Sequence, residues 1–422
     1  MSKMIIKNVK HFSSGEMISV YIRDGLFSDT AFSADADTVE IDGEGLTVMP
    51  GLIDMHCHLR EPGFEYREDI ESGTKSAAKG GFTSVCPMPN TNPVCDNAAV
   101  VSGILKKAHD KASTNVFPIG AASKGLLGKE LSEMGLMKEA GIVAVSDDGK
   151  PIATADLLKK VMEYASDFDL PVLNHCEELS VSEGAMNEGV VSTSIGLRGI
   201  PSIAEDLMIA RDVLTAEYLH MPIHICHVST KSGVDIIRQA KKRGVRVTAE
   251  TCPHYFSLTE EACSTFDPNT KMNPPLRTEA DRLAVIEGLK DGTLDCIVTD
   301  HAPHHADEKD IEFSLANNGI VGFETAFALG YTYLVKPGFL SLINLVATMT
   351  TNPSDILRLG RGTLDAGAPA DLTLMNLSDE FTFHKDEMLS KSRNTPFDGF
   401  QLYGRCKLTV KGGTITYDEL RG

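Results

Sequence analysis

The stretch GLIDMHCHLREPG, residues 51–63, begins as an apolar β-strand and ends in two histidines separated by one residue. Side chains alternate between the two faces of a strand, so His56 and His58 point the same way and Cys57 points the opposite way. Two imidazoles side by side at a strand end can bind one metal ion. A chance H-x-H is the alternative interpretation, and the remainder of the chain distinguishes between the two.

Short β-rich runs alternate with longer segments of helical periodicity through the middle of the chain. The expected strands are 51–58, 82–89, 115–121, 142–148, 171–177, 222–229, 245–252 and 295–303. The expected helices include 69–79, 156–168, 203–219, 232–243 and 279–290. Eight strand–helix units in about 300 residues predict an α/β protein built on a closed (β/α)₈ TIM-like barrel.

The two ends of the chain have a different pattern. Residues 1–50 alternate apolar and polar side chains between Gly and Asp turns, which predicts antiparallel strands and no helix. From about Gly362 the pattern returns, and the Gly412-Gly413 pair between KLTV and TITY is typical of a hairpin. We therefore expect a small composite β-sandwich domain from residues 1–50 and 361–422, and a metal-dependent hydrolase barrel over residues 51–360.

Composition excludes several classes of protein. The 422 residues are 42% hydrophobic and 23% charged, as in a globular protein, and the formal net charge of −19 argues against a nucleic-acid or anionic-membrane partner. The chain has no apolar run long enough to span a membrane and no secretory signal at its N-terminus, which predicts a cytoplasmic location. None of the nine cysteines forms a C-x-x-C pair, so we expect small buried hydrophobes in a reducing compartment.

Metal-ligand residues recur where the expected strands end, which is where the active site of a barrel forms. These residues are His56 and His58, Asp147 and Asp148, His175, His227, and Asp300 and His301. Five strands of one barrel ending in His or Asp are hard to reach by chance, so the set predicts a metal centre.

Strand parity narrows this set. His224 and His227 are three residues apart and face opposite sides, so both cannot point inward. His227, at the strand end, is the better ligand, and His224 is expected to be a satisfied structural histidine. Asp300 and His301 are adjacent, so Asp300 can face the metal only if His301 does not.

Several longer motifs accompany these residues. They are HLREPG (58–63), PMPNTNP (87–93), SDDG (146–149), NHCE (174–177), TCPHYF (251–256), NPPLR (273–277), DHAPH (300–304) and GFETAF (322–327). The chain resembles the amidohydrolase superfamily and, nearly end to end, its class I bacterial dihydroorotases. HLREPG with NPPLR and DHAPH is specific to the cyclic-amide hydrolase branch.

The resemblance implies a zinc centre with one or two Zn²⁺ ions, two being favoured. It makes His56, His58, Asp148 and Asp300 the ligands of one ion. The second ion is implied to bind Asp148, His175 and His227. Neutral imidazoles and carboxylates suit Zn²⁺, and paired zinc ions lower the pKa of bound water to near 7.

In this resemblance Asp148 replaces the carboxylated lysine that bridges the metals in many superfamily members. The choice of Asp148 over Asp147 comes from the resemblance, and carboxylation of Lys150 stays an alternative. Asp300, a ligand beside the attacking hydroxide, is the expected general base and then general acid.

Arg60 is expected to bind the carboxylate of a dihydroorotate ring, because an arginine fork donates two parallel hydrogen bonds to a carboxylate. The resemblance adds Asn90 and His304 as its companions, and assigns Asn273 and main-chain groups near Gly322 to the ring amides. A surface salt bridge of Arg60 with a nearby glutamate is the alternative. For Asn90 an ordinary turn is the alternative, and residues 302–320 could be a lid or a plain surface loop.

These features predict a zinc-dependent dihydroorotase that reversibly cyclises N-carbamoyl-L-aspartate to L-dihydroorotate in pyrimidine (UMP) biosynthesis. One alternative is another cyclic-amide hydrolase, such as a dihydropyrimidinase, hydantoinase or allantoinase, whose substrates lack the ring carboxylate. Another alternative is a non-catalytic dihydroorotase-like subunit, which would be expected to lose metal ligands. A homodimer or an association with aspartate transcarbamoylase is plausible for a chain of this kind.

Overall fold

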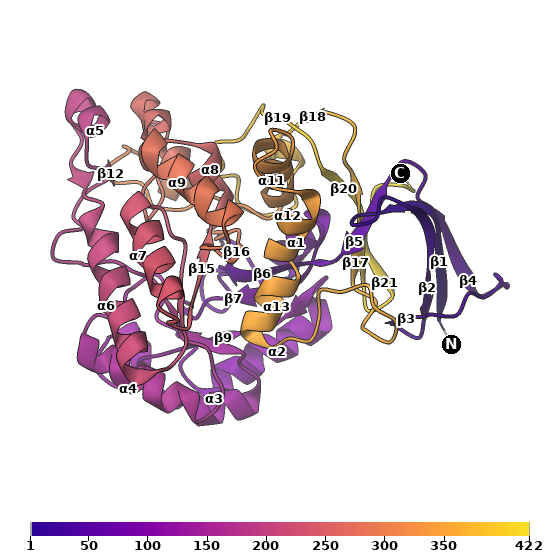
Figure 1. Ribbon diagram of the computed structural model, residues 1–422, viewed down its shortest axis with the longest axis horizontal. Helices are drawn as coiled ribbons and strands as arrows, with labels where there is room; N and C mark the ends of the chain where they lie inside the picture. The colour runs from indigo at the N-terminus through magenta and orange to yellow at the C-terminus, as the bar shows by residue number, and fades with distance from the viewer. Residues whose placement is uncertain (1, 422) are drawn as a thin grey trace.

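The structure is a computed structural model that describes residues 2–421. Figure 1 shows an α/β body and, beside it, a β-sheet that carries both ends of the chain. Within the described residues, none of the helices combines the length and the apolar character that crossing a membrane requires.

The sheet beside the body has eight strands and takes them from both ends of the chain, in the order β21-β20-β17-β5-β1-β2-β3, with β4 also paired to β1. The bounds from the N-terminal end are β1 Lys3–His11, β2 Met17–Arg23, β3 Leu26–Phe27, β4 Thr38–Asp42 and β5 Thr47–Pro50. The bounds from the C-terminal end are β17 Leu372–Asn376, β20 Arg405–Lys411 and β21 Thr414–Asp418.

The structure of this sheet confirms one expectation from the sequence and corrects another. The hairpin is confirmed: β20 and β21 are antiparallel, and Gly412 and Gly413 between them have φ of 54° and 75°. The expectation of a purely antiparallel N-terminal segment is wrong, because β1 pairs with β2 antiparallel but with β4 and β5 parallel. Alternation of apolar and polar side chains is the same in both kinds of pairing, so it cannot distinguish them.

The α/β body contains a series of parallel strands. They are β6 Leu52–Cys57, β7 Phe82–Pro87, β8 Asn115–Val116, β9 Ile119–Ala121, β10 Ala144–Ser146, β11 Leu173–Asn174, β14 Ile223–Ile225, β15 Val247–Thr251 and β16 Cys296–Ile297. The pairings run β6-β7-β8, β9-β10 and β11-β14-β15-β16. Isolated parallel bridges join Val145 to Val172 and Cys57 to His301.

Helices alternate with these strands and surround them in Figure 1. The longer helices are α1 Ile70–Lys79, α2 Ala98–Lys111, α4 Ala155–Ser166, α6 Ile203–Leu219, α7 Lys231–Lys242 and α9 Glu279–Lys290. Five of the six were expected, and the structure confirms them to within two residues at each end. Two begin at capping boxes: Asp69 accepts from the Ser72 amide, and Thr278 accepts from the Asp281 amide.

Shorter elements complete the chain. The short α-helices are α3 Met134–Ala140, α5 Val190–Ile195, α8 Pro253–Ser257, α10 Ala306–Lys309, α11 Ala326–Gly330, α12 Leu342–Thr348 and α13 Thr351–Leu357. The remaining strands are β12 Met186–Asn187, β13 Gly199–Ile200, β18 Phe381–Thr382 and β19 Gln401–Leu402. Short 3₁₀-helices lie at η1 Lys124–Leu126, η2 Glu260–Thr265, η3 Pro268–Thr270 and η5 Lys385–Glu387, and η4 Tyr331–Val335 is a π-helical turn.

Two apolar cores stabilise the two parts. The core of the body lies between the parallel strands and the helices and includes Leu52, Phe82, Ile225 and Ile297. The sheet has a second core around Ile6, Val48, Leu374 and Leu408. All nine cysteines are buried and free of disulfides.

Candidate metal centre and substrate cavity

Asp148 lies at the centre of a group of buried imidazoles, just beyond the C-terminal end of β10. Its Oδ1 is 3.4 Å from His56 Nε2, 3.5 Å from His175 Nδ1 and 3.4 Å from His227 Nε2. Its Oδ2 is 3.6 Å from His58 Nε2. These side chains come from four different strand ends, so one carboxylate joins residues that are far apart in the sequence.

Asp300 reaches the same group from the strand end after β16. Its Oδ1 is 3.1 Å from His58 Nε2 and 3.7 Å from His56 Nε2. His175 Nδ1 and His227 Nε2 face each other at 2.8 Å. Two sets have mutual spacings that suit a metal ion, His56–Asp148–His227 and His56–His58–Asp300. The structure thus brings together all six residues predicted as ligands.

Asp147 and Lys150 point elsewhere. The Asp147 carboxylate accepts hydrogen bonds from the Ser123 amide at 2.8 Å and from the Ser123 hydroxyl at 2.5 Å. Lys150 is exposed, and its Nζ donates to the carbonyl oxygen of Leu126 at 3.4 Å. Neither side chain approaches the imidazoles as Asp148 does.

The donor set fits a metal ion. His56 Nε2 and Asp148 Oδ1 are buried and have no hydrogen-bond partner among the described residues. A buried polar atom without a partner costs about 1–3 kcal/mol, which a bound cation would offset. Burial raises the pKa of Asp148, but the surrounding imidazoles outweigh burial and hold that pKa well below its usual value. The carboxylate is therefore anionic, as a ligand must be.

The backbone is strained at three of the predicted site residues. Arg60, His227 and Asp300 have φ of 62°, 34° and 43°, in the left-handed region that side chains other than glycine rarely adopt. Such conformations cost about 1–3 kcal/mol each and cluster at functional sites. Here each one turns the chain sharply at a strand end and directs its side chain toward the cluster or the cavity beside it.

A cavity of about 340 Å³ opens over this group of ligands. Its wall contains five of the six predicted ligands, all except His56, which lies beneath them. The predicted substrate-binding residues that also line it are Arg60, Asn90, Asn273 and His304. The cavity has the size and polarity of a site for a small polar molecule.

Arg60 is buried in the wall of this cavity, with 8% of its surface exposed. Its Nε donates to the carbonyl oxygen of Pro303 at 3.1 Å, and its Nη2 lies 3.3 Å from His304 Nε2. No carboxylate forms an ion pair with it among residues 2–421, so the structure shows no salt bridge with Glu61 or Glu65. A buried guanidinium that faces a cavity without a carboxylate partner has N–H donors available for an anion in that cavity.

Arg60 and His304 influence each other. Burial, with Arg67 nearby, lowers the pKa of Arg60 to about 10, so it stays charged at neutral pH. Burial and then the cations Arg60 and Arg67 lower the pKa of His304 to about 2. A neutral imidazole can accept from Arg60 through Nε2, and its Nδ1 lies 3.3 Å from Asn317 Nδ2 and 3.4 Å from Glu308 Oε2.

The two predicted asparagines connect the cavity to the ligands. Asn90 Oδ1 accepts a hydrogen bond from His58 Nδ1 at 2.9 Å. Asn273 Nδ2 donates to Glu177 Oε2 at 3.2 Å, and the same oxygen lies 3.0 Å from His175 Nε2. Burial raises the pKa of Glu177, but the effects of His175 and Asn273 outweigh burial and lower that pKa to about 2. Each asparagine therefore contacts a ligand directly or through one carboxylate.

Gly322 is the one predicted substrate-binding residue that does not line the cavity wall. Its amide donates to His301 Nδ1 at 3.2 Å, and its carbonyl oxygen accepts from the Thr325 and Ala326 amides. The turn after β16 thus uses the main chain of Gly322 to hold His301, which stacks on Phe323 with ring centroids 4.0 Å apart. Asp300 and His301 do diverge, as strand parity predicts.

Residues 302–320 form part of the cavity wall through Ala302, His304 and Asn317–Gly319. Lys271, outside the segment, and Lys309, within it, bind carbonyl oxygens at its far end. Lys271 Nζ donates to the carbonyl oxygens of Ser314 and Ala316, and Lys309 Nζ donates to those of Asn317 and Gly319. The segment is therefore tied to the body in this structure and covers one side of the cavity.

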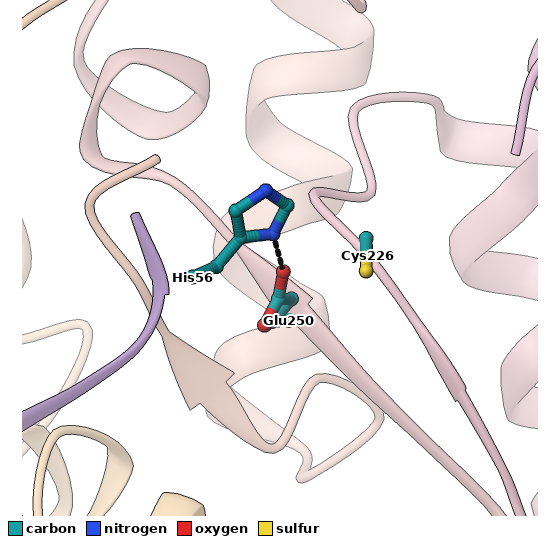
Figure 2. Close-up of side chains that lie close together, drawn as sticks. All are labelled: His56, Cys226 and Glu250. Atoms are coloured by element: carbon teal, nitrogen blue, oxygen red, sulfur yellow. Dashed lines mark hydrogen bonds and ion pairs between the residues drawn. The ribbon is translucent and has the colours of Figure 1, made fainter. Parts of the chain in front are cut away.

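Sequence reasoning missed two carboxylates that contact predicted ligands, the buried Glu250 and the partly buried Glu177. Glu250, on β15, accepts from His56 Nδ1 at 2.6 Å, as Figure 2 shows. Glu177 contacts His175 in the same way. A signal was present in each case: Glu250 is a charged residue inside a β-rich run, and Glu177 follows His175 at the spacing that places both on one face of a strand. Their partners could not be read from the sequence, because His56 is 194 residues from Glu250.

Known proteins resemble the chain along nearly its whole length. The family described as Dihydro-orotase-like matches residues 45–233. A protein named Dihydroorotase from Ruminiclostridium cellulolyticum is 56% identical, with 98% of each chain covered. Another of that name from Acetivibrio thermocellus is 55% identical, with 96% of this chain and 95% of the relative covered.

Solved structures show the same fold at lower identity. The L-hydantoinase (dihydropyrimidinase) of Arthrobacter aurescens has a TM-score of 0.88 at 24% identity, covering 99% of this chain and 97% of that one. The dihydropyrimidinase of Brevibacillus agri has a TM-score of 0.85 at 22% identity, covering 99% and 95%. The chain therefore has the same fold as these two proteins.

Proposed function

The chain belongs to the dihydroorotase family, and from this premise we propose how its site carries out the reaction. The enzyme interconverts N-carbamoyl-L-aspartate and L-dihydroorotate, with loss of water on ring closure, in pyrimidine (UMP) biosynthesis. The observation that carries this proposal is Arg60, a buried guanidinium with no carboxylate partner among the described residues, in one cavity with the ligand cluster. Of the cyclic amides considered, dihydroorotate alone brings a ring carboxylate to that position.

We propose that the cluster binds Zn²⁺, with two ions favoured. His56, His58, Asp148 and Asp300 would hold one ion, and Asp148, His175 and His227 the other. The unpartnered His56 Nε2 and Asp148 Oδ1 support this assignment, as does the set of imidazole and carboxylate donors. The orientation of Asp147 toward Ser123 supports Asp148 as the shared ligand.

When bound there, Zn²⁺ supplies Lewis-acid activation of water and of the amide carbonyl. Asp300 would move the proton between the attacking water and the ring nitrogen, since its carboxylate lies at the edge of the cavity beside His58. In the ring-closing direction the same carboxylate would take the proton from the carbamoyl nitrogen. A single group serves both directions because the reaction is reversible.

Substrate orientation would come from the cavity wall. Arg60 would donate to the ring carboxylate, with Asn90 and a neutral His304 on either side of it. Asn273 would face the ring amides from the opposite wall. A role for the main chain of Gly322 stays a prediction, since its amide and carbonyl are engaged elsewhere in this structure.

We also propose the finer description of the fold and of the family. The parallel pairings and the two bridges support a closed (β/α)₈ barrel over residues 51–360. The shared sheet and its separate core support a composite β-sandwich domain of residues 1–50 and 361–422. An aspartate in place of the bridging lysine supports the class I bacterial type.

Location and assembly are further proposals. Nine buried, free thiols are compatible with a reducing cytoplasm. A homodimer and a complex with aspartate transcarbamoylase stay predictions, which sedimentation of the purified chain, alone and mixed with that enzyme, would test.

The function is tested by assaying the purified enzyme on dihydroorotate beside dihydrouracil, hydantoin and allantoin. We expect a preference for dihydroorotate, because the other rings leave Arg60 without a partner. A preference for an uncharged ring would show that the chain is a different cyclic-amide hydrolase. Absence of turnover after zinc addition would favour the non-catalytic subunit.

A further inference from the structure

A buried chain of hydrogen bonds runs from the ligand cluster through the interior of the parallel strands. Glu250 lies between two imidazoles: its Oε1 is 2.6 Å from His56 Nδ1, and its Oε2 is 3.1 Å from His224 Nε2. His224 Nδ1 is in turn 2.8 Å from Thr248 Oγ1. Figure 2 shows the first of these contacts, with the Glu250 carboxylate aimed at the edge of the His56 ring. The side chains of His56 and Glu250 are fully buried, and that of His224 is 1% exposed.

The donor and the acceptor of each hydrogen bond in this series can be assigned from the chemistry of the groups. A carboxylate only accepts hydrogen bonds, so His56 Nδ1 and His224 Nε2 must both donate to Glu250. A neutral His224 then accepts at Nδ1 from the Thr248 hydroxyl. A neutral His56 with its proton on Nδ1 has its lone pair on Nε2, which is the atom left without a partner 3.4 Å from Asp148 Oδ1. Each ring nitrogen is therefore used except the one that faces the cluster.

We propose that Glu250 and His224 are positioning residues, which hold the His56 ring in the tautomer and orientation that present Nε2 to the metal. This inference rests on the proposed function and deepens it. Carboxylates that bind the second nitrogen of a ligating histidine fix its tautomer and raise its basicity. His224, expected from sequence to be only a satisfied structural histidine, acts here by holding the second oxygen of Glu250 so that the first stays aimed at His56.

His56, Cys226 and Glu250 also have a spacing that suits a metal ion, so these three residues could be interpreted as a separate metal site. The contacts favour positioning instead. His56 Nδ1 is already hydrogen-bonded to Glu250, and both oxygens of Glu250 are taken by imidazoles. A metal at that place would have to displace these bonds and share His56 with the cluster above.

The end of this hydrogen-bond series that lies farthest from the ligand cluster is at a second cavity, of about 470 Å³. The wall of this cavity includes His224 and Thr248. The wall also includes Val172, Ile223 and Arg246, which lie at or just before the N-terminal ends of three parallel strands. This cavity is therefore on the side opposite the substrate cavity. It gives a small molecule a route to the place of the His224 ring.

The first test replaces Glu250 by glutamine, which keeps the size but offers one acceptor oxygen and an amide donor. Glutamine can satisfy one imidazole and confronts the other with an N–H group. We expect E250Q to bind Zn²⁺ about 10- to 100-fold more weakly in a chelator competition. The visible spectrum of the Co²⁺ form should change as well, because the His56 ligand is no longer held in one orientation.

The matched control is E205Q. Glu205 is buried like Glu250, with 3% of its surface exposed, but its carboxylate accepts from Ser229 and Thr230 and pairs with Arg277 rather than with a histidine. We expect E205Q to lower the melting temperature and to leave Zn²⁺ affinity and the Co²⁺ spectrum unchanged. Equal metal affinity in E250Q and wild type, or an equal loss in E205Q, would overturn the proposal.

The second test uses H224A, which keeps Glu250 but removes its outer partner, on the side of the second cavity. We expect weaker Zn²⁺ binding, restored by millimolar imidazole that enters through the second cavity. Wild type and the double variant H224A/E250Q at the same imidazole concentration give the effect of imidazole on free metal. A gain in Zn²⁺ affinity that is confined to H224A supports the positioning role of His224. Equal changes in Zn²⁺ affinity in all three proteins contradict it. H224A also tests the proposal if E250Q does not fold.

Turnover of the wild type separates this inference from the proposed function. If wild type binds zinc but does not hydrolyse dihydroorotate, the proposed function fails, while the affinities of E250Q and E205Q still decide the role of Glu250. If wild type is active and E250Q keeps its zinc affinity, the proposed function stands and the positioning role fails.

Discussion

The strand ends that hold the ligand cluster and the sheet formed by the chain ends differ in where they place charge. In the cluster, pairs such as His56–Asp148 and His58–Asp300 have side chains at most 6% exposed. In the sheet, pairs such as Lys3–Asp35 and Lys7–Glu40 are between 25% and 47% exposed, and the interior is apolar. Exposed pairs contribute little, whereas buried charges need strong compensation.

This contrast separates two roles within one chain. The sheet contributes stability through apolar burial. The cluster contains buried atoms that have no partner among the described residues and positive φ at His227 and Asp300, features that cost stability and are compensated when a cation binds. Substitutions in the cluster should therefore change metal binding and turnover, and substitutions in the sheet should change stability alone.

The largest effect is expected for D148N. This change removes the charge of the carboxylate that lies among four imidazoles, so zinc content should fall and dihydroorotate turnover should drop by at least about 10³-fold. Metal analysis of the purified variant, together with turnover, gives the measurement.

D147N is the matched control for D148N. Its amide replaces an acceptor that binds Ser123, so we expect a loss of about 1–3 kcal/mol in unfolding free energy with zinc retained. If D147N loses its zinc and D148N keeps it, the assignment of the shared ligand is wrong.

The next effect is that of R60Q, which removes the guanidinium but keeps a polar side chain. Loss of a charge-assisted pair in a buried site costs about 2–5 kcal/mol, so kcat/KM for dihydroorotate should fall roughly 30- to 5,000-fold. Zinc content should not change, because Arg60 contacts His304 and Pro303 rather than a ligand. A kcat/KM equal to that of wild type would show that Arg60 does not bind the substrate carboxylate.

A third prediction addresses the sheet. Leu374 on β17 is fully buried in the second core. L374A should lower the free energy of unfolding by about 2–5 kcal/mol, as expected for a large-to-small change in a packed core. Urea denaturation measures this, and zinc affinity at a temperature where the variant is folded should equal that of wild type. A matching loss of zinc affinity would show that the two regions are not independent.

The smallest effect concerns pH and Lys309, beside the substrate cavity. Burial lowers the pKa of Lys309 from 10.5 to about 7. Between these values the unfolded chain binds one more proton than the folded chain, so Lys309 makes stability rise with pH, by up to about 1.4 kcal/mol per pH unit. Below pH 7 both states are protonated and this slope disappears. Urea midpoints of wild type and K309M at pH 7 and pH 9 should diverge, and parallel profiles would contradict the prediction.

Much of the cluster could be predicted because strand geometry is local. The period of two places His56 and His58 on one face and separates Asp300 from His301, and the structure has these orientations. Helices such as α6 Ile203–Leu219 and α9 Glu279–Lys290 likewise follow from periodicity and capping. Recognition of the dihydroorotase motifs supplied the choice of Asp148, which periodicity alone left open.

What sequence reasoning did not supply depends on contacts between distant segments. The partner of Glu250 is 194 residues away, and the parallel pairing of β1 with β4 and β5 has the same alternation as an antiparallel one. The engagement of the Gly322 amide by His301 follows from how the chain turns after β16. Such facts are set by tertiary packing, which a local pattern does not encode.

The central claim is that one cavity holds metal at Asp148 and the substrate carboxylate at Arg60. The most direct measurement is anomalous diffraction at the zinc edge from crystals of the zinc-loaded enzyme with dihydroorotate. The account predicts zinc in contact with Asp148 and His56, and the ring carboxylate in contact with Arg60. Zinc bound away from Asp148, or a substrate carboxylate away from Arg60, would contradict it.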